Sequence, residues 1–425
     1  MKSNTQHSLL CQSKSCSTQS VNLKKPYSIY PQESKPCASI LRLEEVDAQG
    51  DASGGGNLIS SPSLLSNSID TLHISLKITG LSKLISEMKE SKELLQSGND
   101  QEMPFEFLKN GSTHFQWNIQ RSGIPYYPYM FKCGDIRLCL SARPSDHDMP
   151  NAQLMIGSIS CQQGSKAYLN NFKFWMSCID IHVIEEKISR LDLCVDIATD
   201  IKNHALDDIS RFITRARDSN IHHSNRAFNS IVWGSGDIMC RIYDKSLELL
   251  QTKSCEKIMF FSELWGGFPK NVTRVEFQLR RGAIKSFFKG STSLEHISAR
   301  LGDLWEYLTF TWLRHNSGSV DRENRHQDRS ELSPFWLSVQ QADFKKKKPL
   351  TRRKSIRNIN IPALTKQAVG CLLTAVAGIG QQADCFFEVI TTVQELVSKE
   401  LSGFMADPSF ARNMKGKYIA SNVTF

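Results

Sequence analysis

Residues 190–197 read RLDLCVDI, with polar and apolar side chains in alternation. Successive side chains of an extended chain point to opposite faces. The leucines and Val195 would therefore face a core, whereas Arg190, Asp192 and Asp196 would share the opposite face. This pattern predicts a strand that is buried on one side and carries charged groups on the other.

Two later stretches repeat the alternation. Residues 273–280 read TRVEFQLR, and residues 240–245 read CRIYDK. If all three stretches are strands of one sheet with a common core, a single surface gathers acidic groups, a phenol and several cations. The later stretches contribute to that surface Arg274, Glu276, Gln278, Arg280, Arg241, Tyr243 and Lys245.

The remaining patterns are typical of an α+β protein with a mainly antiparallel sheet and flanking helices. Trp305 and Trp312 fall on an apolar helical stripe, which indicates core positions. Further strands are predicted at 71–79, 113–119, 136–141, 152–159 and 229–233. Helices are predicted at 81–97, 206–213, 294–315, 362–380 and 384–403.

Three segments are expected along the chain. Residues 1–68 are rich in Ser, Gln and Gly and have no apolar period, which predicts a disordered arm. Residues 69–340 carry the regular patterns and form the folded domain. Residues 341–425 form a basic linker followed by helices, and the part from residue 345 onward carries a net charge of +8, against +9 for the whole chain.

The composition is that of an ordinary globular protein, with 425 residues, 40% hydrophobic and 22% charged. The first ten residues lack an apolar signal core. The longest apolar run, 368–379, is shorter than the roughly 20 residues that span a bilayer. The twelve cysteines include no CxxC pair, so no zinc site is expected. These features predict a cytoplasmic protein with no membrane partner.

Cations are concentrated at the start of the tail, where eight positive charges fall within thirteen residues. Lys and Arg neutralise phosphates and release counterions, so this run is a candidate DNA-binding segment. A solvated linker explains the same composition equally well. The residues concerned include Lys345, Lys346, Lys347, Lys348, Arg352 and Arg353.

The acidic groups suggest a site for a hard cation, Mg²⁺ or Mn²⁺. Carboxylates on neighbouring strands can lie about 5 Å apart. Asp192 and Asp196 are four residues apart on one strand, roughly 13 Å between their Cα atoms. We therefore expect Glu276 to bind a metal with only one of them. The alternative is the solvated polar face of an antiparallel sheet, which needs no metal.

The three stretches resemble the signature blocks of the replication initiation factor family, which includes rolling-circle plasmid Rep proteins and relaxases of some conjugative elements. The matching residues are 190–196, 241–245 with Glu248, and 274–280, in the same order and with similar spacing. Residues 69–75 are also similar to the opening strand of such domains. The resemblance spans about residues 69–340.

This resemblance implies a metal-dependent DNA nickase. Its tyrosine would attack a phosphodiester at an origin, leaving a 5′-phosphotyrosine and a free 3′-OH for a polymerase. The implied partners are origin DNA, single-stranded or supercoiled, and a host helicase or polymerase, and a homodimer is compatible with it. The catalytic residues would be Tyr243, Arg241 and Lys245. The metal ligands would be Asp192, Asp196 and Glu276. The residues that contact DNA would be Arg190, Arg274 and Arg280.

The chain also departs from the family. Val232 occupies a strand position that is often tyrosine in relatives, and no helix-turn-helix is evident before the domain. The His-x-His metal motif of other nickases is missing, since His222 and His223 are adjacent. Several functions stay open. They are a non-catalytic DNA-binding regulator on the same scaffold, a plasmid or phage initiator, a conjugative relaxase and a protein-interaction module.

Overall fold

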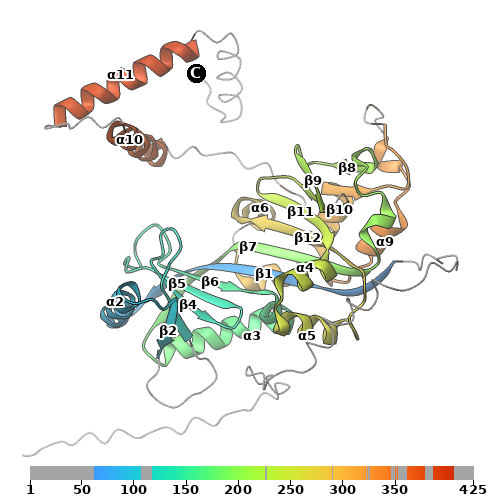
Figure 1. Ribbon diagram of the computed structural model, residues 1–425, viewed down its shortest axis with the longest axis horizontal. Coiled ribbons are helices and arrows are strands. Elements are labelled where there is room, and N and C mark those ends of the chain that lie inside the picture. Colours follow the sequence, from blue (N-terminus) through green and yellow to red (C-terminus); the bar gives the residue numbers. More distant parts are fainter. Residues whose placement is uncertain are drawn as a thin grey trace, which may run out of the picture.

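The protein is built on one eleven-stranded antiparallel sheet, in the strand order β2-β3-β4-β5-β6-β1-β7-β12-β11-β10-β9, with helices on both of its faces (Figure 1). This arrangement confirms the predicted α+β class. The computed structural model describes residues 62–106, 117–224, 227–289, 291–321, 323, 326–345, 350, 352, 361–378 and 386–405.

Two long strands form the centre of the sheet, and a separate two-stranded sheet pairs β8 with β13. The strands are β1 (Ser63–Thr79), β2 (Glu102–Phe105), β3 (Trp117–Gln120), β4 (Tyr129–Cys133), β5 (Ile136–Leu140), β6 (Ala152–Ile156), β7 (His182–Ala198), β8 (Phe212–Thr214), β9 (Ser219–Ser224), β10 (Ala227–Trp233), β11 (Ile238–Asp244), β12 (Val272–Arg280) and β13 (Leu313–His315).

Helices follow or separate the strands. They are α2 (Ser82–Ser97), α3 (Ser158–Ser177), α4 (Lys245–Thr252), α5 (Cys255–Leu264), α6 (Arg281–Phe287), α7 (Leu294–Ser298), α8 (Leu301–Glu306), α9 (Pro334–Gln340), α10 (Ile361–Gly378) and α11 (Phe386–Met405). Helices α10 and α11 agree with the two helices predicted for the tail, and they stand apart from the sheet (Figure 1).

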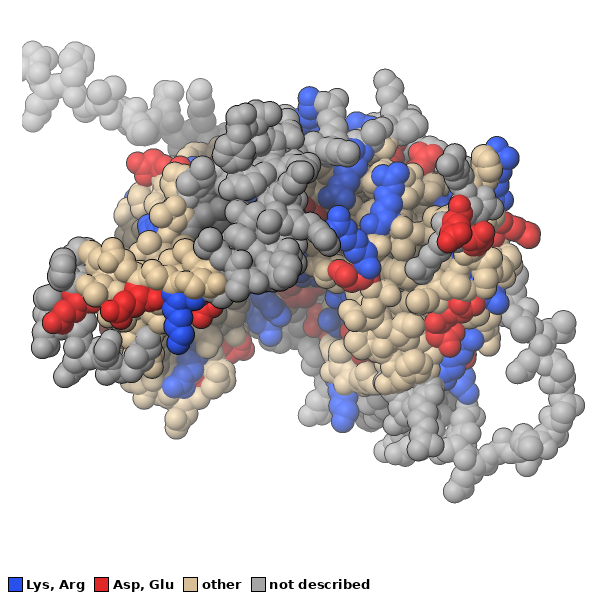
Figure 2. Space-filling model, turned by 90° about the horizontal axis from the view of Figure 1, so that it is seen from above, with Lys and Arg blue, Asp and Glu red and all other residues tan. Residues whose placement is uncertain are grey.

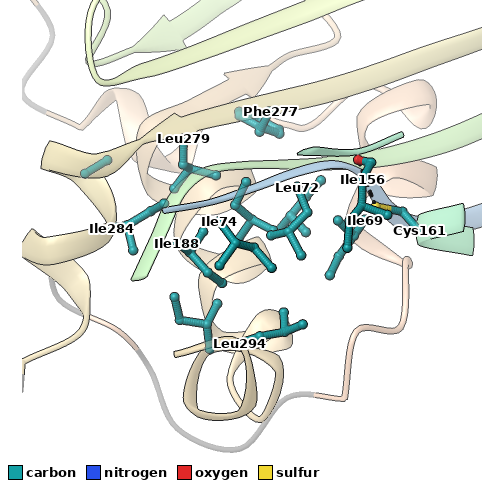
Figure 3. Packing of buried hydrophobic residues seen from close by; sticks show 14 of the residues in the cluster. Ile69, Leu72, Ile74, Ile156, Cys161, Ile188, Phe277, Leu279, Ile284 and Leu294 are labelled. Carbon is teal, nitrogen blue, oxygen red and sulfur yellow. Dashed lines mark hydrogen bonds between the residues drawn. The ribbon is translucent and has the colours of Figure 1, made fainter. Parts of the chain in front are cut away.

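One face of the sheet is apolar and makes the main core. Leu72 of β1 pairs with Ile156 of β6 and with Leu191 of β7, and all three are fully buried. Figure 3 shows how Leu72, Ile74, Phe277 and other members of this cluster pack together. Burial of so many aliphatic and aromatic side chains on one face is the main stabilising contribution to the fold.

The predicted core tryptophans cover this apolar face at β12. The ring of Phe277 meets Trp305 edge to face at 5.5 Å between centroids and Trp312 at 6.0 Å. The indole of Trp305 also donates a hydrogen bond to the carbonyl oxygen of Val339 at 3.1 Å. Both tryptophans are therefore core residues, as the helical stripe indicated.

Three sequence expectations are corrected. Strand β1 begins at Ser63, not near Thr71: residues 63–68 pair with residues 194–198 of β7 although their sequence shows no apolar alternation. The helix predicted at 206–213 is a 3₁₀ turn capped by Asp208 and followed by β8. The rest of the predicted arm, 1–61, lies outside the described residues.

The helix predicted at 294–315 is the third correction. It is divided into α7, α8 and a π-helical turn at Tyr307–Trp312, and the chain then becomes β13. Trp305 and Trp312 both contact the ring of Phe277. Apolar spacing alone cannot distinguish this irregular segment from a regular helix.

No helix in the described part of the chain is both long and apolar enough to span a membrane. The cysteines that the structure describes are all free thiols.

Gly80 and Gly134 provide a matched test of the backbone at two turns. Both have a left-handed φ, +86° and +57°, but a Cβ at Gly80 would lie 2.3 Å from the carbonyl oxygen of Asp180, whereas a Cβ at Gly134 would meet nothing within 4 Å. We expect Gly80→Ala to lower the free energy of unfolding by roughly 1–3 kcal/mol more than Gly134→Ala. Urea unfolding measures this difference, and equal losses would contradict the close approach.

Candidate active site

The polar face of the sheet brings the predicted groups together. In the strand register, Tyr243 pairs with Arg274, which pairs with Asp196, and Arg241 pairs with Glu276. The hydroxyl of Tyr243 donates a hydrogen bond to Oε2 of Glu276 at 3.0 Å. A phenol and a carboxylate from separate strands thus converge on one side of the sheet.

Glu276 lies at the centre of this group. Its side chain is only 6% exposed, and Oε1 is 3.1 Å from Nη2 of Arg241. The same nitrogen of Arg241 donates to Oε1 of Gln278 at 2.8 Å. Arg241 is one-third exposed, so its guanidinium connects the buried carboxylate to the surface.

A buried ion-pair network lies beside the tyrosine. The fully buried guanidinium of Arg274 donates from Nε and Nη2 to the two oxygens of Asp196 at 2.6 and 2.8 Å, and from Nη1 to Asp70 at 2.6 Å. Oδ2 of Asp196 also accepts bonds from Trp265 Nε1 at 3.1 Å and from Ser66 Oγ at 2.9 Å. Three donors fill the lone pairs of that oxygen.

Asp192 lies on the polar face of β7, two residues after Arg190. Nε of Arg190 lies 2.9 and 3.0 Å from its two oxygens. Asp192 has no exposed surface, whereas Arg190 keeps 31% of its side chain exposed. Burial raises the pKa of Asp192, although Arg190 opposes this.

Burial governs the protonation of the two central groups. It raises the pKa of Glu276 to about 7, and the neighbouring charge of Asp70 adds to the effect. Burial and the charge of Glu276 also hold the pKa of Tyr243 well above its ordinary value. The phenol therefore stays protonated near neutral pH and needs a partner to lose its proton.

Lys245 is placed differently from the prediction that it shares a strand face with Tyr243. It is the first residue of α4, almost fully buried, and its Nζ lies 2.6 Å from Oε2 of Glu248. The ammonium group is 5.9 Å from the centroid of the Tyr243 ring. Burial and the charge of Arg274 lower its pKa.

The donor set fits a hard cation only in part. Asp196 accepts bonds from three residues, Arg274, Trp265 and Ser66, whereas Asp192 accepts bonds from Arg190. Asp192 and Glu276 are therefore the less committed of the three predicted ligands. The described residues contain no group of three or more His, Cys, Asp and Glu that could hold a metal. Mg²⁺ is commonly bound by one or two carboxylates together with substrate phosphates and water. Asp192 and Glu276 would have to share a cation in this way, because Asp192 pairs with Gln278 in the strand register and not with Glu276.

The residues predicted to bind DNA separate into three groups. Arg280 is exposed and Arg190 is partly exposed. Arg274, in contrast, is buried and pairs with two carboxylates, so it is not available to DNA. Lys345 is exposed, and Arg352 is partly buried near Ser286 and Asp237. Lys346, Lys347, Lys348 and Arg353 lie outside the described residues.

Sequence reasoning missed Asp70 and Trp265. Asp70 lies at a β-bulge between Ile69 and Thr71, and the bulge turns its carboxylate toward Arg274. Trp265 follows α5, which packs over the polar face, with Phe261 5.0 Å from the Arg274 guanidinium. In the sequence, the apolar residues of 258–265 indicate that this segment packs against part of the sheet.

Comparison with known proteins adds a structural similarity. No family model matches the chain, and no curated protein matches it either. The chain is similar to the solved structure of the rolling circle replication initiator protein from Geobacillus stearothermophilus, with 16% sequence identity and a TM-score of 0.33. The match covers 68% of this chain and 100% of the other.

Removing the charge of Asp196 tests the ion-pair network. In Asp196→Asn the guanidinium of Arg274 loses its bidentate partner while it stays buried, so we expect the free energy of unfolding to fall by about 3–5 kcal/mol. The matched control is Asp180→Asn, whose carboxylate pairs with Lys83 at the surface. Urea unfolding of both variants checks this, and losses of similar size would show that the network stabilises little.

The raised pKa of Glu276 predicts a pH-dependent stability difference. The folded protein holds the proton of Glu276 up to about pH 7, whereas the unfolded chain releases it near 4.5. Wild-type protein should therefore lose up to roughly 3 kcal/mol relative to Glu276→Gln as the pH rises from 4.5 to 7. Unfolding in chelator-containing buffer measures this, and parallel pH curves would contradict the raised pKa.

Proposed function

We propose that the protein is a tyrosine endonuclease that cuts one strand of DNA and initiates rolling-circle replication. The observation that carries the proposal is the 3.0 Å hydrogen bond from the Tyr243 hydroxyl to Glu276, next to the partly exposed guanidinium of Arg241. A nucleophile in contact with a proton acceptor and next to a cation is the arrangement that attack on a phosphodiester requires.

Tyr243 would act as the nucleophile. Its oxygen attacks phosphorus while the phenolic proton passes to Oε2 of Glu276, and the bond from phosphorus to the 3′ oxygen breaks. The 3′ oxygen takes a proton from water, which leaves a free 3′-OH and a 5′-phosphotyrosine. Glu276 with a pKa of about 7 is suited to hold this proton at neutral pH, because a general base works best near the operating pH.

Arg241 would bind the scissile phosphate. Its guanidinium already bridges Glu276 and Gln278 at the edge of the buried region, so it can stabilise negative charge on the phosphate oxygens. Asp192 and Glu276 would hold Mg²⁺ or Mn²⁺ together with the phosphate. A divalent cation there would neutralise phosphate charge and lower the pKa of the phenol.

Arg274, Asp196 and Asp70 would be positioning residues. They fix β12 against β7 and β1 at the point where Tyr243 pairs with Arg274. Lys245 would contribute positive charge beside the tyrosine ring without contacting substrate, since it is buried against Glu248.

The nucleophile is tested with Tyr243→Phe on supercoiled DNA of the replicon that encodes the chain, in Mg²⁺ or Mn²⁺. Wild-type protein should nick the DNA and form a covalent conjugate at Tyr243, and the variant should form none while its DNA affinity changes less than about threefold. Mass spectrometry of the DNA-linked peptide and a binding titration measure both quantities.

Tyr168→Phe is the matched control, because its hydroxyl also donates a hydrogen bond to a side-chain oxygen, Oε1 of Gln163 at 2.6 Å. It should form the conjugate normally. A conjugate in Tyr243→Phe would assign the nucleophile elsewhere. Wild-type protein that binds the DNA and never forms a conjugate would be a non-catalytic DNA-binding protein.

A further inference from the structure

The polar face of the sheet continues beyond the candidate site as a row of cations. Strand pairing places Lys132 opposite Arg137, Arg137 opposite Met155, and Met155 opposite His73. His73 pairs in turn with Arg190, and Arg190 pairs with Arg280. We call the four charged members, Lys132, Arg137, Arg190 and Arg280, the basic row.

Three of these four side chains are available to a ligand, whereas Arg190 is paired with Asp192. Lys132, Arg137 and Arg280 are exposed, and no carboxylate of the described residues forms an ion pair with any of them. Figure 2 shows several Lys and Arg side chains close together on the face in view, with Asp and Glu side chains among them. Cations that are exposed, aligned and unpaired are the usual footprint of a phosphate-binding surface.

His73 lies inside the row, between Met155 and Arg190 in the strand register. Its pKa falls to about 4, first because it is largely buried and then because Arg190 and Arg137 repel its charged form. The two guanidinium groups therefore flank His73 on one face of the sheet, as the register requires. His73 is neutral near pH 7, so it does not repel a phosphate.

The dimensions suit an extended strand. Five strand-to-strand steps separate Lys132 from Arg280, roughly 24 Å in all. Arg280 and Glu276 lie four residues apart on β12, roughly 13 Å, so one end of the row approaches the candidate site. Arg190 joins the two regions, because it belongs to the row and also pairs with Asp192.

We propose that the basic row binds the phosphates of single-stranded DNA that runs across the strands toward Tyr243. The proposal rests on the proposed function and adds the path of the substrate. A single strand is favoured over a duplex because the row is one cation wide. On its Tyr243 side it is bordered by the carboxylates of Asp192 and Glu276, which would repel a second line of phosphates.

The test removes two cations far from the tyrosine. Lys132→Ala with Arg137→Ala is compared with Lys166→Ala with Lys173→Ala, two lysines of α3, which packs on the apolar face of the sheet. Binding of a fluorescent oligothymidylate is measured by anisotropy over a range of salt concentrations. Each lost phosphate contact should reduce the slope of log affinity against log salt by about 0.7, so the first pair should lose about 1.4 and the control pair nothing.

The outcomes separate the two proposals. If the variant with Lys132→Ala and Arg137→Ala keeps the wild-type slope while wild-type protein still forms the Tyr243 conjugate, the basic row does not bind DNA and the proposed function stands. If wild-type protein forms no conjugate but the slope falls as expected, the row binds DNA and the nuclease proposal fails. If a duplex of equal length binds more tightly and loses the same slope, the single-strand assignment is overturned.

Discussion

The ion pair between Arg274 and Asp196 is the constraint on which the polar side of the structure depends. A guanidinium and a carboxylate, both without exposed surface, join β12 to β7, and Asp70 extends the pair to β1. Buried charges are tolerated only when they are paired and hydrogen-bonded. Trp265 and Ser66 complete the bonds of Asp196, so the same interaction also attaches the segment after α5 to the sheet.

This network accounts for the unusual state of the neighbouring groups. Because α4 and α5 cover the polar face near Arg274, Glu276 and Tyr243 lie in a region of low dielectric where an uncompensated charge is costly. The pKa values of both groups rise for that reason. When Glu276 is ionised, the proton of Tyr243 can pass to it without any change in the net charge of the pair.

Sequence patterns predicted the part of this arrangement that depends on periodicity. Alternation placed Tyr243, Glu276 and Asp192 on one face, and the register confirms it. It could not predict Asp70, since a bulge of one residue turns that side chain from one face to the other. It also could not show that Oδ2 of Asp196 accepts a hydrogen bond from Trp265, because that contact joins residues 69 positions apart and depends on how α5 packs.

The site lies at the border between the covered and the open parts of the polar face, and this position suits the proposed chemistry. Toward α5 the groups are buried, which strengthens every electrostatic interaction among them. Toward Arg190 and Arg280 the face is open to a phosphate chain. Arg241 stands at the border, where it pairs with Glu276 at 3.1 Å and is one-third exposed. A phosphate that reached Arg241 would compete with Glu276 for the guanidinium, and a Glu276 released from this pair would accept the tyrosine proton more readily. Substrate binding and activation of the nucleophile would then be coupled through one side chain.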